Sequence, residues 1–174
     1  SEIITVGDNL AVMRRLPDAS IDLIYADPPF KTGRVQEQGR EGHRFDDRWP
    51  GGIRGYLAFL ESRLREMHRL LRPTGSLYVH LDWHAVHYVK VLLDEVFGYE
   101  NFLNEIVWSY RTGGLSAEWF ARKHDTILAY ARQRGRHTFH VLRDGKFRTD
   151  GLNRDEQGRP YKQTKRGRLY FHPD

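Results

Sequence analysis

The chain has 174 residues, of which 39% are hydrophobic and 29% charged, with a formal net charge of +5. This length suits one ordinary domain, and no apolar stretch approaches the roughly 18 residues that cross a bilayer, so we expect no membrane partner. The absence of cysteine excludes disulfides, thiolate nucleophiles and Cys-based zinc sites. The N-terminal residues show no secretory signal pattern, and we therefore expect a cytoplasmic protein.

The first part of the chain alternates between strand and helix patterns. A β-branched run predicts a strand over residues 2–6, and apolar residues at helical spacing predict a helix over residues 9–16. A second strand over residues 21–26 ends at a double proline, which cannot continue a central ladder. Residues 31–52 then form a long loop, of the kind that is usually a lid or a disordered segment.

The middle of the chain continues the alternation. Apolar spacing predicts a helix over residues 53–71, a turn at 73–75, a strand over 76–81 and a helix that begins near Val86 and stops at Gly98. Strand and helix patterns in alternation indicate a mostly parallel sheet. Two further strands, over residues 104–110 and 126–131, have no long helix between them, which predicts an antiparallel pair at the sheet edge.

The composition changes at residue 133, where we place a boundary between a core, residues 1–132, and a basic region, residues 133–174. The basic region holds eleven Lys and Arg against five Asp and Glu, so the positive excess of the chain lies entirely there. Tyr161, Tyr170 and Phe171 are interleaved with these charges. An ordinary solvated surface explains this pattern, and so does a polyanionic partner such as DNA.

Each of the three early strands is followed by an aspartate, at Asp8, Asp27 and Asp82. Ligands of open α/β sheets bind beyond the carboxyl ends of the strands, so parallel strands would gather these carboxylates along one rim. Helix capping is the alternative for Asp8 and Asp82. It does not apply to Asp27, which is followed by prolines.

Asp27-Pro28-Pro29-Phe30 is the segment with the most specific chemistry. Its prolines restrict the backbone so that a carboxylate, the Pro28 carbonyl and an aromatic ring can point into one cleft. The two oxygens can accept the hydrogens of an exocyclic amine, and the ring can stack on a base turned out of a duplex. A rigid turn with a packed Phe30 is the alternative interpretation.

Other chemistries fit the sequence less well. The group His80, Asp82, His84 and His87 matches no zinc signature, and we predict no metal site. A phosphate-binding Gly-x-x-x-x-Gly-Lys-Ser/Thr loop is absent, which argues against a kinase or ATPase. Methylation of cytosine C5 usually needs a cysteine nucleophile, and the chain has none.

The sequence resembles the N6-adenine and N4-cytosine DNA amino-methyltransferases of the beta class, including the modification subunits of type III restriction systems. The likeness covers roughly residues 3–132. It is carried by Gly7-Asp8-Asn9, by Ile21 to Phe30 with Thr32-Gly33, by Gly75 to Asp82, by Asn104 to Trp108 and by Lys123 to Leu128.

The resemblance implies an α/β class: a Rossmann-like sheet that is mostly parallel with an antiparallel edge pair. It further implies S-adenosylmethionine as cofactor, double-stranded DNA as substrate, a restriction or specificity subunit as partner, and room for an oligomer. Family members with Asp at the first motif position usually methylate adenine N6, which is our expectation, with cytosine N4 as the alternative. The implied catalytic residues are Asp27, Pro28, Pro29 and Phe30. Asp8 and Asp27 would face the cofactor. The expected DNA-binding residues are Lys31, Arg34, Arg111, Lys162, Lys165, Arg166 and Arg168.

One departure from the family pattern concerns the glycine-rich Phe-x-Gly-x-Gly loop, which the chain lacks. We therefore expect a sheet that is incomplete at the C-terminal side, with an incomplete cofactor pocket and no activity of this segment in isolation. The alternative function is a DNA-binding fragment or subunit that performs no catalysis alone. Methylation of RNA or of a protein glutamine is a third hypothesis, against which Asp27 argues, because related folds carry Asn at that position.

Overall fold

The computed structural model describes residues 3–32, 35–38, 43–46, 49–111, 117–141 and 152–170, and only the backbone over 35–38 and 43–46. The chain forms two compact units, residues 1–138 and 139–174. Each unit is considered by itself. No helix in these ranges is both long and apolar enough to pass through a lipid bilayer.

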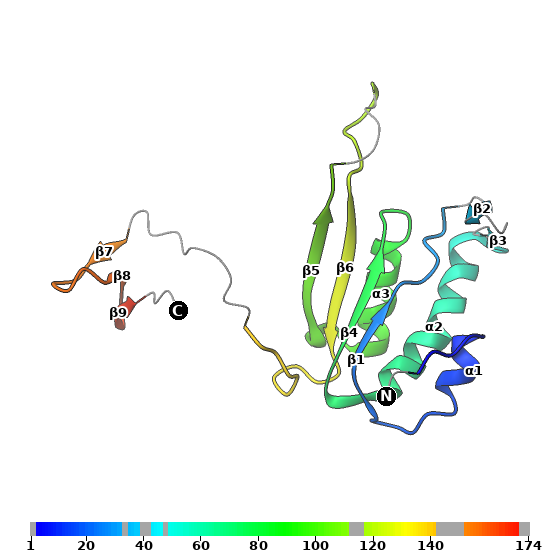
Figure 1. The fold of residues 1–174 in the computed structure, drawn as a ribbon, viewed down its shortest axis with the longest axis horizontal. Coiled ribbons are helices and arrows are strands. Elements are labelled where there is room, and N and C mark those ends of the chain that lie inside the picture. Colours follow the sequence, from blue (N-terminus) through cyan, green and yellow to red (C-terminus); the bar gives the residue numbers. More distant parts are fainter. Residues whose placement is uncertain are drawn as a thin grey trace. The chain divides into compact units, whose positions relative to one another are not determined.

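The first unit is built on a four-stranded sheet in the order β1-β4-β6-β5 (Figure 1). Its strands are β1 (Ile21–Ala26), β4 (Leu71–Leu81), β5 (Phe102–Ser109) and β6 (His124–Ala131). β1 and β4 run parallel, whereas β6 is antiparallel to both of its neighbours. The α/β class and the antiparallel edge pair predicted from the sequence are therefore confirmed. The described sheet is mixed rather than mostly parallel, since one of its three strand pairs is parallel and two are antiparallel.

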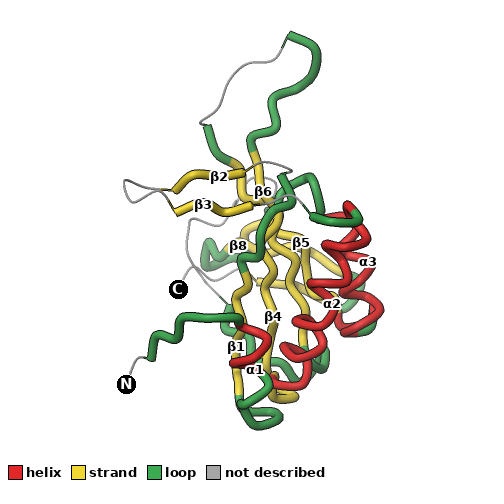
Figure 2. Tube along the Cα trace, turned by 90° about the vertical axis from the view of Figure 1, so that its right-hand side faces the viewer, coloured by secondary structure: helices red, strands yellow, loops and turns green. Residues whose placement is uncertain are grey.

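Two helices cover one face of this sheet, α2 (Gly52–Leu70) and α3 (Val86–Phe97) (Figure 2). Both were predicted from their apolar spacing, and the predicted stripes are buried. Alternate β4 residues, Leu77, Val79 and Leu81, complete the core from the sheet side, since successive strand residues point to opposite faces. Burial of each such large side chain stabilises the fold by about 1.5–3 kcal/mol. The 3-10 turn η1 (Tyr99–Asn101) leads from α3 to β5.

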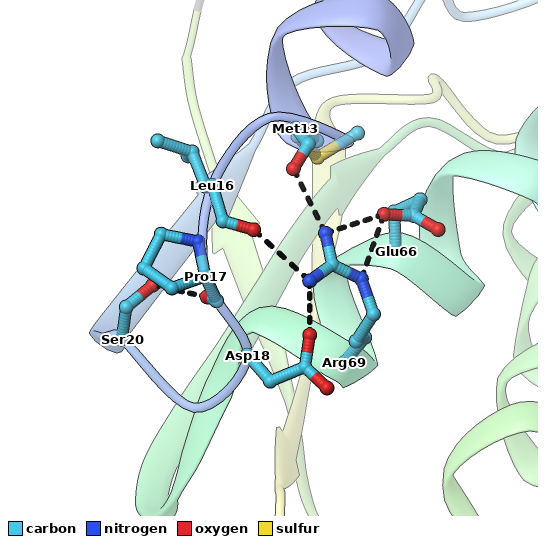
Figure 3. Close-up of polar contacts among 7 residues, drawn as sticks. All are labelled: Met13, Leu16, Pro17, Asp18, Ser20, Glu66 and Arg69. Carbon is cyan, nitrogen blue, oxygen red and sulfur yellow. Dashed lines mark hydrogen bonds and ion pairs between the residues drawn. The ribbon is translucent and has the colours of Figure 1, made fainter.

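The N-terminal helix α1 (Asn9–Met13) is shorter than the predicted helix over residues 9–16. Beyond it, the connection to β1 is held by Arg69 in the last turn of α2 (Figure 3). The Arg69 guanidinium donates to the carbonyl oxygens of Met13 at 2.9 Å and Leu16 at 3.0 Å, and it pairs with Asp18 and Glu66. One side chain thus fixes the entry into β1.

The predicted strand over residues 2–6 is wrong. Residues 3–6 have no regular structure, and Ile3, Ile4 and Val6 are all at least 84% exposed. A β-branched run becomes a strand only when a neighbouring strand satisfies its backbone groups, and none within the described residues pairs with this one.

Two connections also differ from the prediction. The loop expected over residues 31–52 contains an antiparallel hairpin, β2 (Val35–Gln38) with β3 (His43–Asp46). The turn expected at residues 73–75 lies inside β4, where the register against β1 shifts. At Gly75 a Cβ atom would lie 3.0 Å from the Asp22 carbonyl oxygen, so this close approach of the two strands favours glycine. Irregular structure was predicted for residues 31–52 because of their mixed charges and for residues 73–75 because of their proline.

The second unit contains a three-stranded antiparallel sheet in the order β7-β8-β9. Its strands are β7 (Asn153–Arg154), β8 (Pro160–Thr164) and β9 (Gly167–Tyr170). Tyr161 and Tyr170 are cross-strand partners, with ring centroids 5.7 Å apart. The hairpin turn between β8 and β9 is made by Lys165 and Arg166, which places two exposed cations at its tip.

Candidate active site

Asp27 to Phe30 follow β1 at its carboxyl end, beside the carboxyl end of the parallel strand β4. The Asp27 side chain is 59% exposed. The hydroxyl of Tyr56, a fully buried residue of α2, donates to the Pro29 carbonyl oxygen at 2.7 Å. Directly after Phe30, the chain turns through Lys31, which has a left-handed φ of 57°. The segment is therefore anchored to the core while its carboxylate stays accessible.

His80 lies against this segment from the penultimate position of β4. Its Nδ1 atom is 3.6 Å from an Asp27 carboxylate oxygen, and its ring meets the Phe30 ring edge-on, with centroids 5.3 Å apart. Its Nε2 atom is 3.4 Å from a carboxylate oxygen of Asp125 on β6. Sequence reasoning considered His80 only as a metal ligand and missed this contact. The strand alternation carried a signal, because Leu77, Val79 and Leu81 take the helix-facing positions and leave His80 on the other face.

Two carboxylates, those of Asp27 and Asp125, flank His80 at this rim. Burial raises the pKa of the Tyr110 hydroxyl, and the carboxylate of Asp125, to which it is hydrogen-bonded, raises it further. Burial likewise raises the pKa of Tyr25, with Asp27 as the second cause. Fixed carboxylates favour a ligand group that donates hydrogen bonds, such as an amine, over a phosphate.

A cavity of about 260 Å³ opens beside the Asp-Pro-Pro turn. Asp27 and Pro28 line it together with Asn9 and Arg63, and the apolar side chains of Leu60, Leu64 and Met67 complete its wall. Arg63 is mostly buried, and its guanidinium contacts Asn9 at 2.9 Å. The cavity thus combines an apolar wall with one anionic and one cationic group.

Asp8 does not follow a strand as predicted, because residues 3–6 form none. Its carboxylate accepts from the Leu10 backbone N–H at 3.1 Å, as the N-cap of α1, and pairs with Arg63 at 2.8 Å. The capping alternative therefore describes its contacts. Asp8 is linked to the cavity by its ion pair with Arg63, which lines it. Its role toward a cofactor stays a prediction.

Asp82 forms a local turn ahead of α3. Its carboxylate accepts from the His84 backbone N–H at 2.9 Å and contacts His84 Nδ1 at 2.5 Å. Within the described ranges, no three or more His, Asp or Glu side chains are grouped so that they could hold a metal ion. Trp83 stacks on His84 and carries the guanidinium of Arg122 at 3.8 Å from its ring centroid.

The predicted DNA-binding residues fall on both units. Lys31 follows Phe30, and the exposed Arg111 follows β5 at the same end of the sheet as Asp27. Arg34 lies outside the described residues. The remaining four residues are exposed on the β8–β9 hairpin of the second unit: Lys162, Lys165, Arg166 and Arg168. The Arg168 guanidinium lies 4.7 Å from the Tyr161 ring centroid.

The comparison with known families decides the class of the protein. The N6_N4_Mtase model, described as DNA methylase, matches residues 21–169, which include the Asp27 segment and most of the second unit. The chain belongs to this DNA methylase family.

Relatives and solved structures of DNA methylases agree with this assignment. The chain is 30% identical to the type II methyltransferase M.KpnI of Klebsiella pneumoniae over 193 residues, covering 99% of this chain and 46% of M.KpnI. It is 24% identical to the Mod subunit of the type III restriction-modification enzyme EcoP15I of Escherichia coli, covering 74% of this chain and 24% of that subunit. The chain therefore spans less than half the length of either relative.

A solved structure shows the same fold. TTHA0409 of Thermus thermophilus, in complex with S-adenosyl-L-methionine, superposes with a TM-score of 0.53 at 22% identity, covering 79% of this chain and 55% of that one. The four-stranded sheet of this DNA methylase thus corresponds to part of the methyltransferase sheet, as the resemblance implied.

Proposed function

We propose that this DNA methylase transfers a methyl group from S-adenosylmethionine to the N6 atom of an adenine that is turned out of double-stranded DNA. The observation that carries the proposal is the arrangement of Asp27 and Phe30, an exposed carboxylate and a partly exposed ring on one anchored turn at the sheet rim. Family membership supports the reaction class, and Asp rather than Ser at the first motif position supports adenine over cytosine.

The cavity beside the turn suits one end of S-adenosylmethionine. Its apolar wall can hold uncharged parts of the cofactor, while Arg63 and Asp27 offer one group of each sign to its carboxylate and its cationic or hydroxyl groups. Asp8 would act indirectly, by holding Arg63. When bound, the cofactor supplies an electrophilic methyl group.

The residues of the chain would prepare the amine that receives this methyl group. The lone pair of an exocyclic amine is delocalised into the base, so the nitrogen is a weak nucleophile. Asp27 and the Pro28 carbonyl would accept its two hydrogens and shift the nitrogen toward tetrahedral geometry. Phe30 would stack on the base and keep it in place. Because a fixed carboxylate needs no reorganisation during the reaction, its stabilisation of developing positive charge is large.

Two further regions would hold the DNA. The β8–β9 hairpin offers phosphate contacts through Lys162, Lys165, Arg166 and Arg168. In the first unit, Phe120 is 99% exposed on the segment between β5 and β6, and Arg122 follows it beside Trp83. Aromatic and cationic side chains at the rim that carries Asp27 are suited to bases and phosphates near the target.

We propose a restriction subunit as the protein partner, because the relative EcoP15I Mod is a subunit of a restriction-modification enzyme. We also propose that the protein acts in the bacterial cytoplasm, where its DNA substrate is found. Self-association is compatible with this proposal. Methylation of cytosine N4 is the second candidate, because the matching family includes both activities in its name. A segment that binds DNA but needs further polypeptide for catalysis is the third, since the chain spans 46% of M.KpnI.

Analysis of host DNA separates these candidates. The protein, in the full length that its gene encodes, is expressed in a host that lacks DNA methylases, and its DNA is digested to nucleosides for mass spectrometry. We expect N6-methyladenine at levels absent from a vector control. Detection of N4-methylcytosine instead would support the second candidate. Absence of both methylated bases would contradict the proposed transfer.

A further inference from the structure

His80 occupies a position that the proposed reaction does not yet use. It lies between two carboxylates of unlike exposure, Asp27 at 59% and Asp125 at 20%. Its own side chain is 21% exposed, and its Nε2 atom is buried with no hydrogen-bond partner in the described part of the chain. A buried polar atom without a partner is costly, and such atoms in native folds call for a reason.

The geometry connects His80 to both residues that would hold the base. Nδ1 faces Asp27, and the His80 ring forms a T-shaped contact with Phe30. On the opposite side, Nε2 faces Asp125, whose carboxylate also binds the Tyr110 hydroxyl. Among the described residues, Tyr25 of β1 is a further titratable neighbour, with its ring centroid 6.3 Å away. A row of contacts thus runs from the exposed carboxylate of Asp27, through His80 of β4, to the partly buried carboxylate of Asp125 on β6.

The distances show what this row can do. At 3.6 and 3.4 Å, both nitrogen–oxygen separations exceed an ordinary hydrogen bond. Contacts in enzyme sites are often this long before the substrate binds and shorten in the complex. If the Asp27 carboxylate approaches Nδ1 by about half an ångström, an Nδ1–H donor can bind it. Donation from both ring nitrogens, to Asp27 and to Asp125, requires the protonated imidazole. This contact with Nδ1 would restrict the orientation of the Asp27 carboxylate.

We propose that His80, supported by Asp125, is a positioning residue that fixes the Asp27 carboxylate and the Phe30 ring for the incoming base. The proposal rests on the methyl transfer proposed above. It assigns to His80 no contact with the substrate and no methyl chemistry. It differs from a purely structural role in predicting a loss of turnover without a matching loss of stability or DNA affinity.

Steady-state kinetics of the protein in its encoded length, with S-adenosylmethionine and duplex DNA, test this proposal. For His80→Leu we expect kcat to fall about 10- to 100-fold, as small misplacements of reacting groups do. The Kd for DNA and the melting temperature stay near wild type. The matched control is His68→Leu, which removes a partly buried histidine of α2 away from the rim and leaves kcat unchanged.

Conservative variants make the test specific. Asn places an N–H near the position of Nδ1, whereas Gln places one near Nε2, so we expect His80→Asn to retain a higher kcat than His80→Gln or His80→Leu. Asp125→Asn combined with His80→Leu is expected to cost far less than the product of the two single losses. The Asn and Gln variants also decide the matter if His80→Leu does not fold.

The outcomes separate the two proposals. If the wild type transfers methyl groups and His80→Leu does so within twofold of it, the role of His80 is overturned while the enzyme proposal stands. Equal kcat values for the Asn and Gln variants would overturn it too. If the wild type transfers none, the proposed function fails first and the role of His80 fails with it.

Discussion

Phe30 forms a T-shaped contact with His80, with ring centroids 5.3 Å apart, and remains partly exposed. If a flipped base stacks on it, we expect Phe30→Ala to weaken capture of the base by roughly 1–3 kcal/mol, the usual worth of one base–aromatic stack. Phe30→Trp keeps a flat ring and is expected to retain capture. The fluorescence of 2-aminopurine at the target position reports the flipped state. Equal signals from wild type and Phe30→Ala would remove the stacking role.

The residues of the site differ in how far the sequence could predict them. Asp27 to Phe30 are adjacent in the chain, so their shared turn could be predicted from the prolines alone. Tyr56, His80 and Asp125 join them only through the packing of α2 and the registers of β4 and β6. Those registers depend on long-range pairing, which local patterns do not contain. The predicted strand before Asp8 was wrong for the same reason, since it has no partner in the described sheet.

At the scale of elements, α2 carries a pH-sensitive contact. The His68 ring meets Phe97 of α3 edge-on at 4.8 Å, and burial lowers its pKa, with Arg132 and Arg65 as further causes. The folded state therefore disfavours the protonated ring. As pH falls through the ordinary value of 6.5, the unfolded chain takes up the proton more readily, so this group lowers the free energy of unfolding. The free energy of unfolding stops falling on account of this group once the pH is below the lowered pKa of the folded state, and it is not regained at lower pH.

We expect His68→Phe to remove this contribution, because it keeps the ring contact and abolishes titration. Urea midpoints measured at pH 7.5 and near pH 5 are expected to differ less in the variant than in the wild type. All other residues are identical in the two proteins, so their contributions cancel in the comparison. A variant with the same or a larger pH dependence would show that His68 is not the group responsible.

The elements that periodicity predicted well are those whose burial is one-sided. α2 and α3 present one apolar stripe each, and both appear within a residue or two of the predicted limits. β4 starts earlier than predicted because the backbone accommodates Pro73 and Gly75 in an irregular stretch rather than a turn. Proline excludes a regular ladder position but not a bulge, which the sequence alone does not distinguish.

At the scale of the whole molecule, most of the net positive charge, +4 of +5, belongs to the second unit, while the candidate site lies in the first. If the β8–β9 hairpin neutralises phosphates, each contact steepens the slope of log affinity against log salt by about 0.9. We expect Lys165→Ala with Arg166→Ala to flatten that slope by up to about 2 and to weaken binding to all sequences alike. Fluorescence anisotropy with labelled duplexes at several salt concentrations measures it.

A double variant of equal charge loss controls this experiment. Arg14→Ala with Arg15→Ala removes two exposed cations from the connection between α1 and β1, remote from the hairpin in sequence and from the Asp27 end of the sheet. We expect it to leave the slope unchanged. An unchanged slope in the hairpin variant would instead mean that Lys165 and Arg166 face solvent and that other residues hold DNA.

The central claim is that Asp27 acts on the amine and contributes little to holding DNA, and the rate of methyl transfer by Asp27→Ala tests it most directly. Tritiated S-adenosylmethionine and duplex DNA are used with the protein in its encoded length, and DNA affinity is measured in parallel. The control is Asp22→Ala, which removes an exposed carboxylate of the same strand that pairs with Arg72. Loss of one positioned acceptor is expected to cost about 3 kcal/mol or more, roughly a 100-fold loss of rate, with DNA affinity nearly intact. An Asp27→Ala protein that keeps more than about a tenth of the wild-type rate would contradict the claim.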